Sequence, residues 1–165
     1  GDVYKRQLTA AISIFSCTML PVKAVREAVI TTLIEWHDKF VSIIYVNEES
    51  PVTTFHIIPS YIPKGFSQVE VPDESSGFYY GQFSDSHNNW FDILVLPIEN
   101  TQETFLDNEF STYYSINFNG IQAIWGIMND GSNTLLWERG TLSFQVCGNL
   151  DLTELIKISE KIKVE

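Results

Sequence analysis

Residues 113–125 have the sequence Tyr-Tyr-Ser-Ile-Asn-Phe-Asn-Gly-Ile-Gln-Ala-Ile-Trp, and this stretch decides the fold. Two runs rich in aromatic and β-branched residues flank the dipeptide Asn119-Gly120. An Asn-Gly pair between two alternating runs is the strongest short-range signal for a two-residue β-hairpin, because both residues tolerate positive φ. The sequence therefore predicts two antiparallel strands, at 113–118 and 121–127.

The same two-residue alternation of apolar and polar side chains recurs on both sides of this hairpin. Short connections rich in Gly, Asn, Asp and Ser separate the runs, as expected for strands that follow one another in an antiparallel meander. The further strands predicted in this way are 41–46, 52–58, 66–71, 78–84, 90–96, 134–138 and 142–147.

Two segments have helical rather than two-residue periodicity. Residues 22–44 carry apolar side chains at three- and four-residue spacing, which predicts an amphipathic helix that runs into the next strand. Residues 152–162 predict a C-terminal helix, with Asp151 as N-cap and Glu154 three residues later in a capping-box arrangement. Together the elements predict an α+β fold, an antiparallel β-sheet meander with both helices packed on it. Residues 22–165 form one domain in this interpretation.

The net charge of −11 is concentrated in the middle of the chain. Between residues 47 and 110 there are eleven acidic residues and one basic residue. Such a surface repels the phosphates of nucleic acids and anionic lipid headgroups, so nucleic acid is not expected as a partner. The excess acid is typical of a solvated surface, and it also suits the docking of a basic partner.

The N-terminal residues 1–21 are interpreted as a tether. Lys5 and Arg6 precede a mostly apolar, uncharged run at 8–22, which is short for a bilayer span and suitable for the apolar core of a signal peptide. A transmembrane helix, a cleaved signal peptide, a lipoprotein signal ending at Cys17 and a buried helix all remain open. Residues 1–7 resemble a stub that recurs at the start of gene predictions from metagenomic assemblies, and need not be native.

Three motifs resemble a bacterial family found mainly in Firmicutes, the domain of unknown function 4367. They are Tyr-Ile-Pro-Lys-Gly-Phe at 61–66, the Asn119-Gly120 turn, and Leu-Trp-Glu-Arg-Gly-Thr-Leu-Ser-Phe-Gln-Val-Cys-Gly at 136–148, followed by the C-terminal helix. The resemblance covers roughly residues 22–163. It implies the extracytoplasmic part of a single-span membrane protein, in some members one similar to an anti-sigma factor. This chain has no segment to which sigma-factor binding can be transferred.

No motif for catalysis, phosphate binding or a structural metal is present, and we expect no cofactor and no enzymatic activity. Cys17 and Cys147 lack metal-ligand spacing. His87 lies in a polar loop with Asp85, which would offer only two ligands to a cation. His37 and His56 lie in predicted regular elements and are interpreted as structural.

Aromatic residues provide the candidate binding surface. Tyr79 and Trp90 lie in neighbouring predicted strands and would form an exposed aromatic strip, with Tyr113 as a further contributor, unless helices cover that face. The leading hypothesis is a non-catalytic, envelope-facing sensor or interaction domain of a membrane-anchored regulator. The alternative is a secreted or lipid-anchored binding module for cell-wall glycan, peptide or lipid. An unrecognised enzyme is the third.

Overall fold

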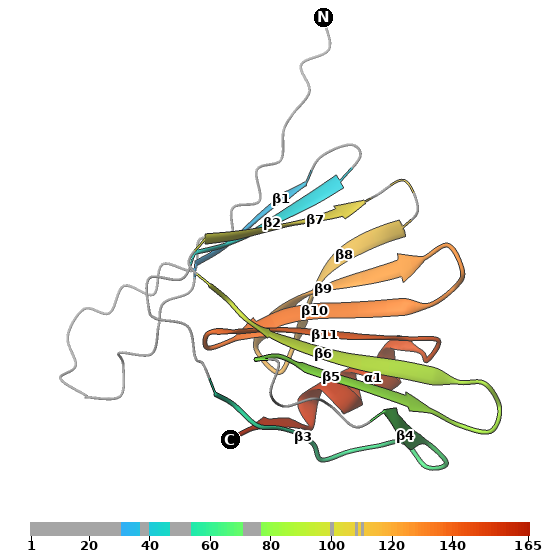
Figure 1. Ribbon diagram of the computed structural model, residues 1–165. Helices are drawn as coiled ribbons and strands as arrows, with labels where there is room; N and C mark the ends of the chain where they lie inside the picture. The colour runs from blue at the N-terminus through green and yellow to red at the C-terminus, as the bar shows by residue number, and fades with distance from the viewer. Residues whose placement is uncertain are drawn as a thin grey trace, which may run out of the picture.

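The computed structural model describes residues 31–36, 40–46, 54–70, 77–99, 101–107, 109 and 111–165. Its main element is a seven-stranded antiparallel sheet, drawn across the centre of Figure 1. In spatial order the strands are β4 (Ser67–Glu70), β5 (Tyr79–Ser84), β6 (Trp90–Pro97), β11 (Leu142–Gly148), β10 (Asn133–Arg139), β9 (Ile121–Met128) and β8 (Ser111–Phe118).

The predicted hairpin around Asn119-Gly120 is confirmed. β8 and β9 pair antiparallel, with Phe118 opposite Ile121, so that Asn119 and Gly120 form a two-residue loop. Both loop residues have positive φ, 52° and 80°, as a type I′ turn requires. The four strands from β8 to β11 form a meander, and β11 then pairs with β6, which continues the sheet through β5 to β4.

One face of this sheet, called the helix face here, carries Phe91, Leu135 and Phe144. The helix α1 (Leu152–Glu160) contacts β10 and β11 and buries Leu155 and Ile158 against this face. Figure 1 shows α1 on one side of the sheet, close to a short ribbon made by β3 (Ile57–Pro59) and β12 (Ile162–Val164). Each large apolar side chain buried here contributes about 1.5–3 kcal/mol, so this face holds most of the core.

The opposite face, called the polar face, carries Asp92, Cys147 and Thr134. A three-stranded sheet of β1 (Thr31–Trp36), β2 (Phe40–Val46) and β7 (Thr101–Asp107) packs on part of it. In the seven-stranded sheet, three strands lie between β6 and β8. The chain between them crosses the polar face and forms β7 of the three-stranded sheet on the way. Val41, Ile43 and Tyr45 of β2 are buried there in a second core cluster with Ile98 and Ile124.

The predicted N-terminal helix is not supported. Within 22–44, residues 31–36 and 40–44 lie in the strands β1 and β2, and the remaining residues lie outside the described part of the chain. β-Branched and aromatic residues explain the difference, because Val41, Ile43 and Tyr45 alternate with a period of two and bury one side of a strand.

Smaller differences concern strand bounds. β7 was not predicted, because its sequence Thr-Gln-Glu-Thr-Phe-Leu-Asp is too polar to stand out. The strand expected at 52–58 is the short β3, and the C-terminal helix ends at Glu160 before β12 begins. The protein is therefore mostly antiparallel β-sheet, with one short C-terminal helix in the described part. The predicted tether at 1–21 lies outside the described residues, and among those that are described no helix is long and apolar enough to span a bilayer.

Candidate functional site

A row of polar side chains crosses the polar face where the three-stranded sheet does not cover it. Register places Gln82, Asp92, Cys147 and Thr134 opposite one another on β5, β6, β11 and β10. In the neighbouring row Tyr80 donates its hydroxyl to Asp92 Oδ2 at 3.1 Å. The strands therefore bring together donors, acceptors, one carboxyl group and one thiol on a surface that is only partly exposed.

Asp92 is the one carboxyl group of this row. Burial raises the pKa of its carboxyl group, and hydrogen bonds from Tyr80 and Gln82 oppose that rise without cancelling it. Its Oδ1 atom is buried and accepts no hydrogen bond from the described part of the chain. A carboxylate in this position is poorly solvated, so its charged form is less stable than it would be in water.

Cys147 lies opposite Asp92 and carries a free thiol. Burial raises the pKa of this thiol, and the carboxylates of Asp92 and Asp130 raise it further. A nucleophilic cysteine needs the opposite, a pKa lowered by a neighbouring cation or a helix N-terminus. The Cys147 side chain is thus a protonated, half-buried thiol without the electrostatic activation of a catalytic cysteine.

A shallow cleft separates the three-stranded sheet from the polar face. Its volume is about 90 Å³, well below the roughly 300–1,000 Å³ of sites that enclose small molecules. Burial and the Glu138 carboxylate raise the pKa of Tyr45, in its wall, to about 12, so that phenol stays protonated. The cleft accommodates a side chain better than a whole ligand. It is lined by Tyr45, Leu94, Leu96, Gln102, Thr104, Leu136, Ser143, Phe144 and Gln145.

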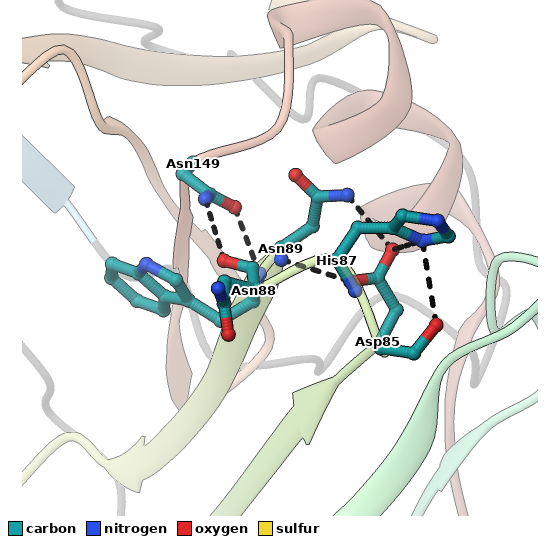
Figure 2. A network of polar contacts seen from close by, with 7 residues as sticks. Asp85, His87, Asn88, Asn89 and Asn149 are labelled. Carbon is teal, nitrogen blue, oxygen red and sulfur yellow. Dashed lines mark hydrogen bonds and ion pairs between the residues drawn. The ribbon is translucent and has the colours of Figure 1, made fainter.

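The loop between β5 and β6 is held by a network of polar contacts (Figure 2). Asp85 Oδ1 accepts the backbone N–H groups of His87 and Asn89 at 2.8 and 2.9 Å, and Asp85 Oδ2 accepts the Asn89 side chain at 2.8 Å. Asn149, after β11, accepts the Trp90 N–H and donates to the Asn88 carbonyl. These contacts fix Asn88 at a φ of 63°, which explains why polar residues fill the loop.

The pairing of Asp85 with His87 does not form a metal site in this geometry. Asp85 uses both oxygens inside the loop, and the hydrogen bond from the Asn89 side chain is the main cause of its lowered pKa. The His87 side chain is 83% exposed, with Nδ1 3.7 Å from Asp85 Oδ2. In the described part of the chain, no three His, Cys, Asp or Glu residues are grouped as metal ligands. Asp85 is therefore a loop-stabilising residue.

The three residues predicted for a binding surface do not lie together. Tyr79 is only 8% exposed and points into the helix-face core, where burial raises its pKa to about 12. Trp90 pairs with Ser84, which is five residues from Tyr79 on the same strand. Because successive side chains of a strand alternate between faces, Ser84 and Trp90 lie on the polar face. The expectation of an exposed Tyr79 is wrong, because the alternation is shifted by one residue and places Phe78 and Tyr80 outside.

Tyr113 is on the polar face but is partly buried by its own sheet. A Cβ atom added at Gly126, its cross-strand partner, would lie 2.6 Å from the Tyr113 ring. The ring therefore lies over the glycine and packs against the second core cluster. Its neighbour Tyr114 points to the helix face instead, is 45% exposed, and lies against Trp125 with ring centroids 5.1 Å apart. Alternation alone does not reveal this pair, because it depends on the register with β9.

The fold and the site together define a β-sheet domain with one covered face and one partly open, polar face. The chain belongs to the family described as Domain of unknown function (DUF4367), which matches residues 56–162 and so confirms the resemblance. The match runs from the segment before β3 to the start of β12, and it leaves β1 and β2 outside. No curated protein and no solved structure matches the chain.

Proposed function

We propose that this chain is the extracytoplasmic interaction domain of a membrane-anchored regulator resembling anti-sigma factors, and that it binds a protein rather than catalysing a reaction. The observation that carries the proposal is the partly open polar face, whose cleft of about 90 Å³ suits a protruding side chain of a partner. Protein interfaces use such open surfaces, whereas small-molecule sites enclose their ligand.

The distribution of charge supports a positively charged partner. The described part of the chain contains five Lys and Arg residues. Lys157, Lys161 and Lys163 lie in α1, at its C-cap and in β12, and Arg139 donates to the Ile162 carbonyl of β12, while Lys64 lies in the turn between β3 and β4. The polar face and the three-stranded sheet carry acidic residues, among them Asp92, Glu103 and Glu138, and no described Lys or Arg lies on either of them. A field of one sign steers an oppositely charged partner and repels nucleic acids and anionic membranes.

The membrane part of the proposal rests on the sequence. The apolar run at 8–22 and the layout of the family both favour a domain held outside the cytoplasm by an N-terminal segment. The test is fractionation of cells that express the full-length gene, combined with protease treatment of intact cells. We expect a membrane-bound product that is cleaved from outside. A variant without residues 8–22 should become soluble. A full-length product found only in the cytosol would refute the proposal.

A second candidate is a secreted or lipid-anchored binding module for cell-wall glycan, peptide or lipid. The exposed Tyr114 against Trp125 favours it, because paired aromatic rings bind sugar rings and apolar chains. Mass spectrometry of the mature N-terminus separates the two candidates. A lipid-modified Cys17, or cleavage next to it, would support this candidate over a transmembrane regulator.

A further inference from the structure

The two ends of the seven-stranded sheet are built very differently. β4 is four residues long, its register with β5 is shifted between Gln68 and Glu70, and it ends in a charged residue. These are the usual ways in which a protein protects an edge strand from pairing with another chain. β8 is eight residues long, contains no charged residue, Pro or Gly, and pairs with β9 in unbroken register. No described strand pairs with its outer side.

The turn between β8 and β9 decides which backbone groups of β8 point outward. In a two-residue turn the flanking residues, here Phe118 and Ile121, form a hydrogen-bonded pair. Hydrogen-bonded pairs alternate along an antiparallel ladder, so Tyr114, Ile116 and Phe118 direct their N–H and C=O groups toward β9. Tyr113 and Ser115, and after them Asn117, direct theirs to the open edge.

The surroundings of this edge are uncharged along the strand and acidic at its beginning. Tyr114 lies against Trp125 on the helix face and offers an aromatic contact beside the edge. Asp107 and Glu109 directly precede β8, and Asp130 follows β9 in the turn beside Ser111. No basic residue occurs in the described part of β7, β8, β9 or the turns that join them.

We propose that the outer edge of β8 binds an extended, basic segment of a partner protein, which adds to the sheet as a further strand. Main-chain hydrogen bonds to Tyr113, Ser115 and Asn117 provide the attachment, as in other cases of β-strand addition. Asp107, Glu109 and Asp130 select positive charge at the end of the segment that lies beside Ser111. Pairing with a second copy is disfavoured, because each copy carries a net charge of −11. The inference rests on the proposed function and names the class of partner.

The probe for the experiment is a display library of random ten-residue peptides, selected for binding to the full chain. We expect the enriched peptides to be basic and rich in β-branched residues. Binding should perturb the backbone amide resonances of Tyr113, Ser115 and Asn117 more than those of the β4 edge.

The decisive variants change Ser115, an exposed residue of the edge. Ser115→Pro removes an outward N–H without touching the ladder to β9, so the fold is retained and peptide affinity falls at least tenfold. Ser115→Thr keeps the N–H group and serves as the matched control with unchanged affinity. If Ser115→Pro fails to fold, two variants of opposite charge replace it. Ser115→Lys should weaken the binding of the same basic peptides, and Ser115→Glu should strengthen it.

The inference is overturned by no enriched peptide, by enrichment of acidic peptides, by equal binding to the Ser115→Pro variant, or by a dimer that this variant abolishes. Binding that requires deletion of residues 1–30 also overturns it, because the chain's own segment would then be the occupant. If the β8 edge does not bind basic peptides, the fractionation test of the membrane location still stands. A cytosolic product that still binds the peptides through β8 would refute only the proposed location.

Discussion

The two faces of the seven-stranded sheet are made by the same strands and yet differ in how much apolar surface they bury and how many polar groups they carry. On β6, Phe91, Ile93 and Val95 are fully buried in the helix-face core, while Asp92 and Leu94 between them face the other way. The helix face is held by stacked rings, with Trp137 and Phe144 5.1 Å apart. The polar face holds the smaller second core cluster under the three-stranded sheet, with hydrogen-bonded groups and a shallow cleft beside it.

The difference teaches that β5, β6 and β11 use one side for the main core and the other for surface chemistry. Apolar area removed from water dominates the helix face, and its contribution does not depend on pH. Where the three-stranded sheet leaves the polar face open, the main free-energy terms are hydrogen bonds and partly buried charge, which are individually smaller and depend on pH. Substitutions on the two faces should therefore differ in size and in their response to acid.

The largest expected effect is the truncation of Phe144 on the helix face. Phe144→Ala removes a buried ring that stacks on Trp137 and lies under the guanidinium of Arg139. We expect a loss of about 3–5 kcal/mol in the free energy of unfolding, measured by urea denaturation with circular dichroism. The matched control is Gln145→Ala, the next residue, which faces the polar side and should cost less than about 1 kcal/mol. Equal losses at both positions would contradict the division of the sheet.

A smaller effect is expected where α1 begins over the helix face. The Asp151 side chain accepts the Glu154 backbone N–H at 2.8 Å, which satisfies one of the free donors of the first turn. Asp151→Ala should lower the free energy of unfolding by about 1 kcal/mol, whereas Asp151→Asn should retain most of the stability. The measurement is the same urea titration, and an Ala variant as stable as the Asn variant would show that the cap is unimportant.

Much of the fold was predictable because it depends on local pattern. The Asn119-Gly120 turn, the alternation in the eight strands β2, β4, β5, β6, β8, β9, β10 and β11, and the Asp151 cap all require only neighbouring residues. β1 was missed because three- and four-residue spacing of apolar side chains in 22–40 also fits a helix, and packing against the polar face decides between them. Where a sequence pattern fits both a helix and a strand, tertiary contacts decide which of the two forms.

The candidate site was less predictable because it depends on strand order and register. The polar row forms only because β11 pairs with β6, two strands separated by about fifty residues, and no local signal predicts that pairing. In β5 the sequence pattern predicted Tyr79 on the exposed side, whereas the structure places its neighbour Tyr80 there. A one-residue shift moves every side chain of a strand to the other face. The open edge of β8 likewise becomes visible only when the strand order is known.

The smallest expected effect, and the one that depends on pH, is at Asp92 on the polar face. Burial raises the folded-state pKa of Asp92 above its unfolded value, so the folded state binds the proton more tightly. Stability from this group is therefore present at low pH and is lost as the pH rises through the folded pKa. Asp92→Asn removes the charge and keeps an oxygen acceptor for the Tyr80 hydroxyl. We expect a higher Tm than that of the wild type at pH 7 and no difference near pH 3.

The control is Asp85→Asn, in the loop at the end of the same β5–β6 hairpin. Hydrogen bonds from Asn89 lower the pKa of Asp85, so its stabilising effect is present above the unfolded pKa and is lost as the pH falls through the folded one. Asp85→Asn should therefore lower the Tm at pH 7, and the loss should shrink in acid. The two Asp→Asn changes are chemically identical and should act in opposite directions. A decrease in Tm at pH 7 for both would show that the Asp92 carboxylate gains more from Tyr80 and Gln82 than it loses by burial.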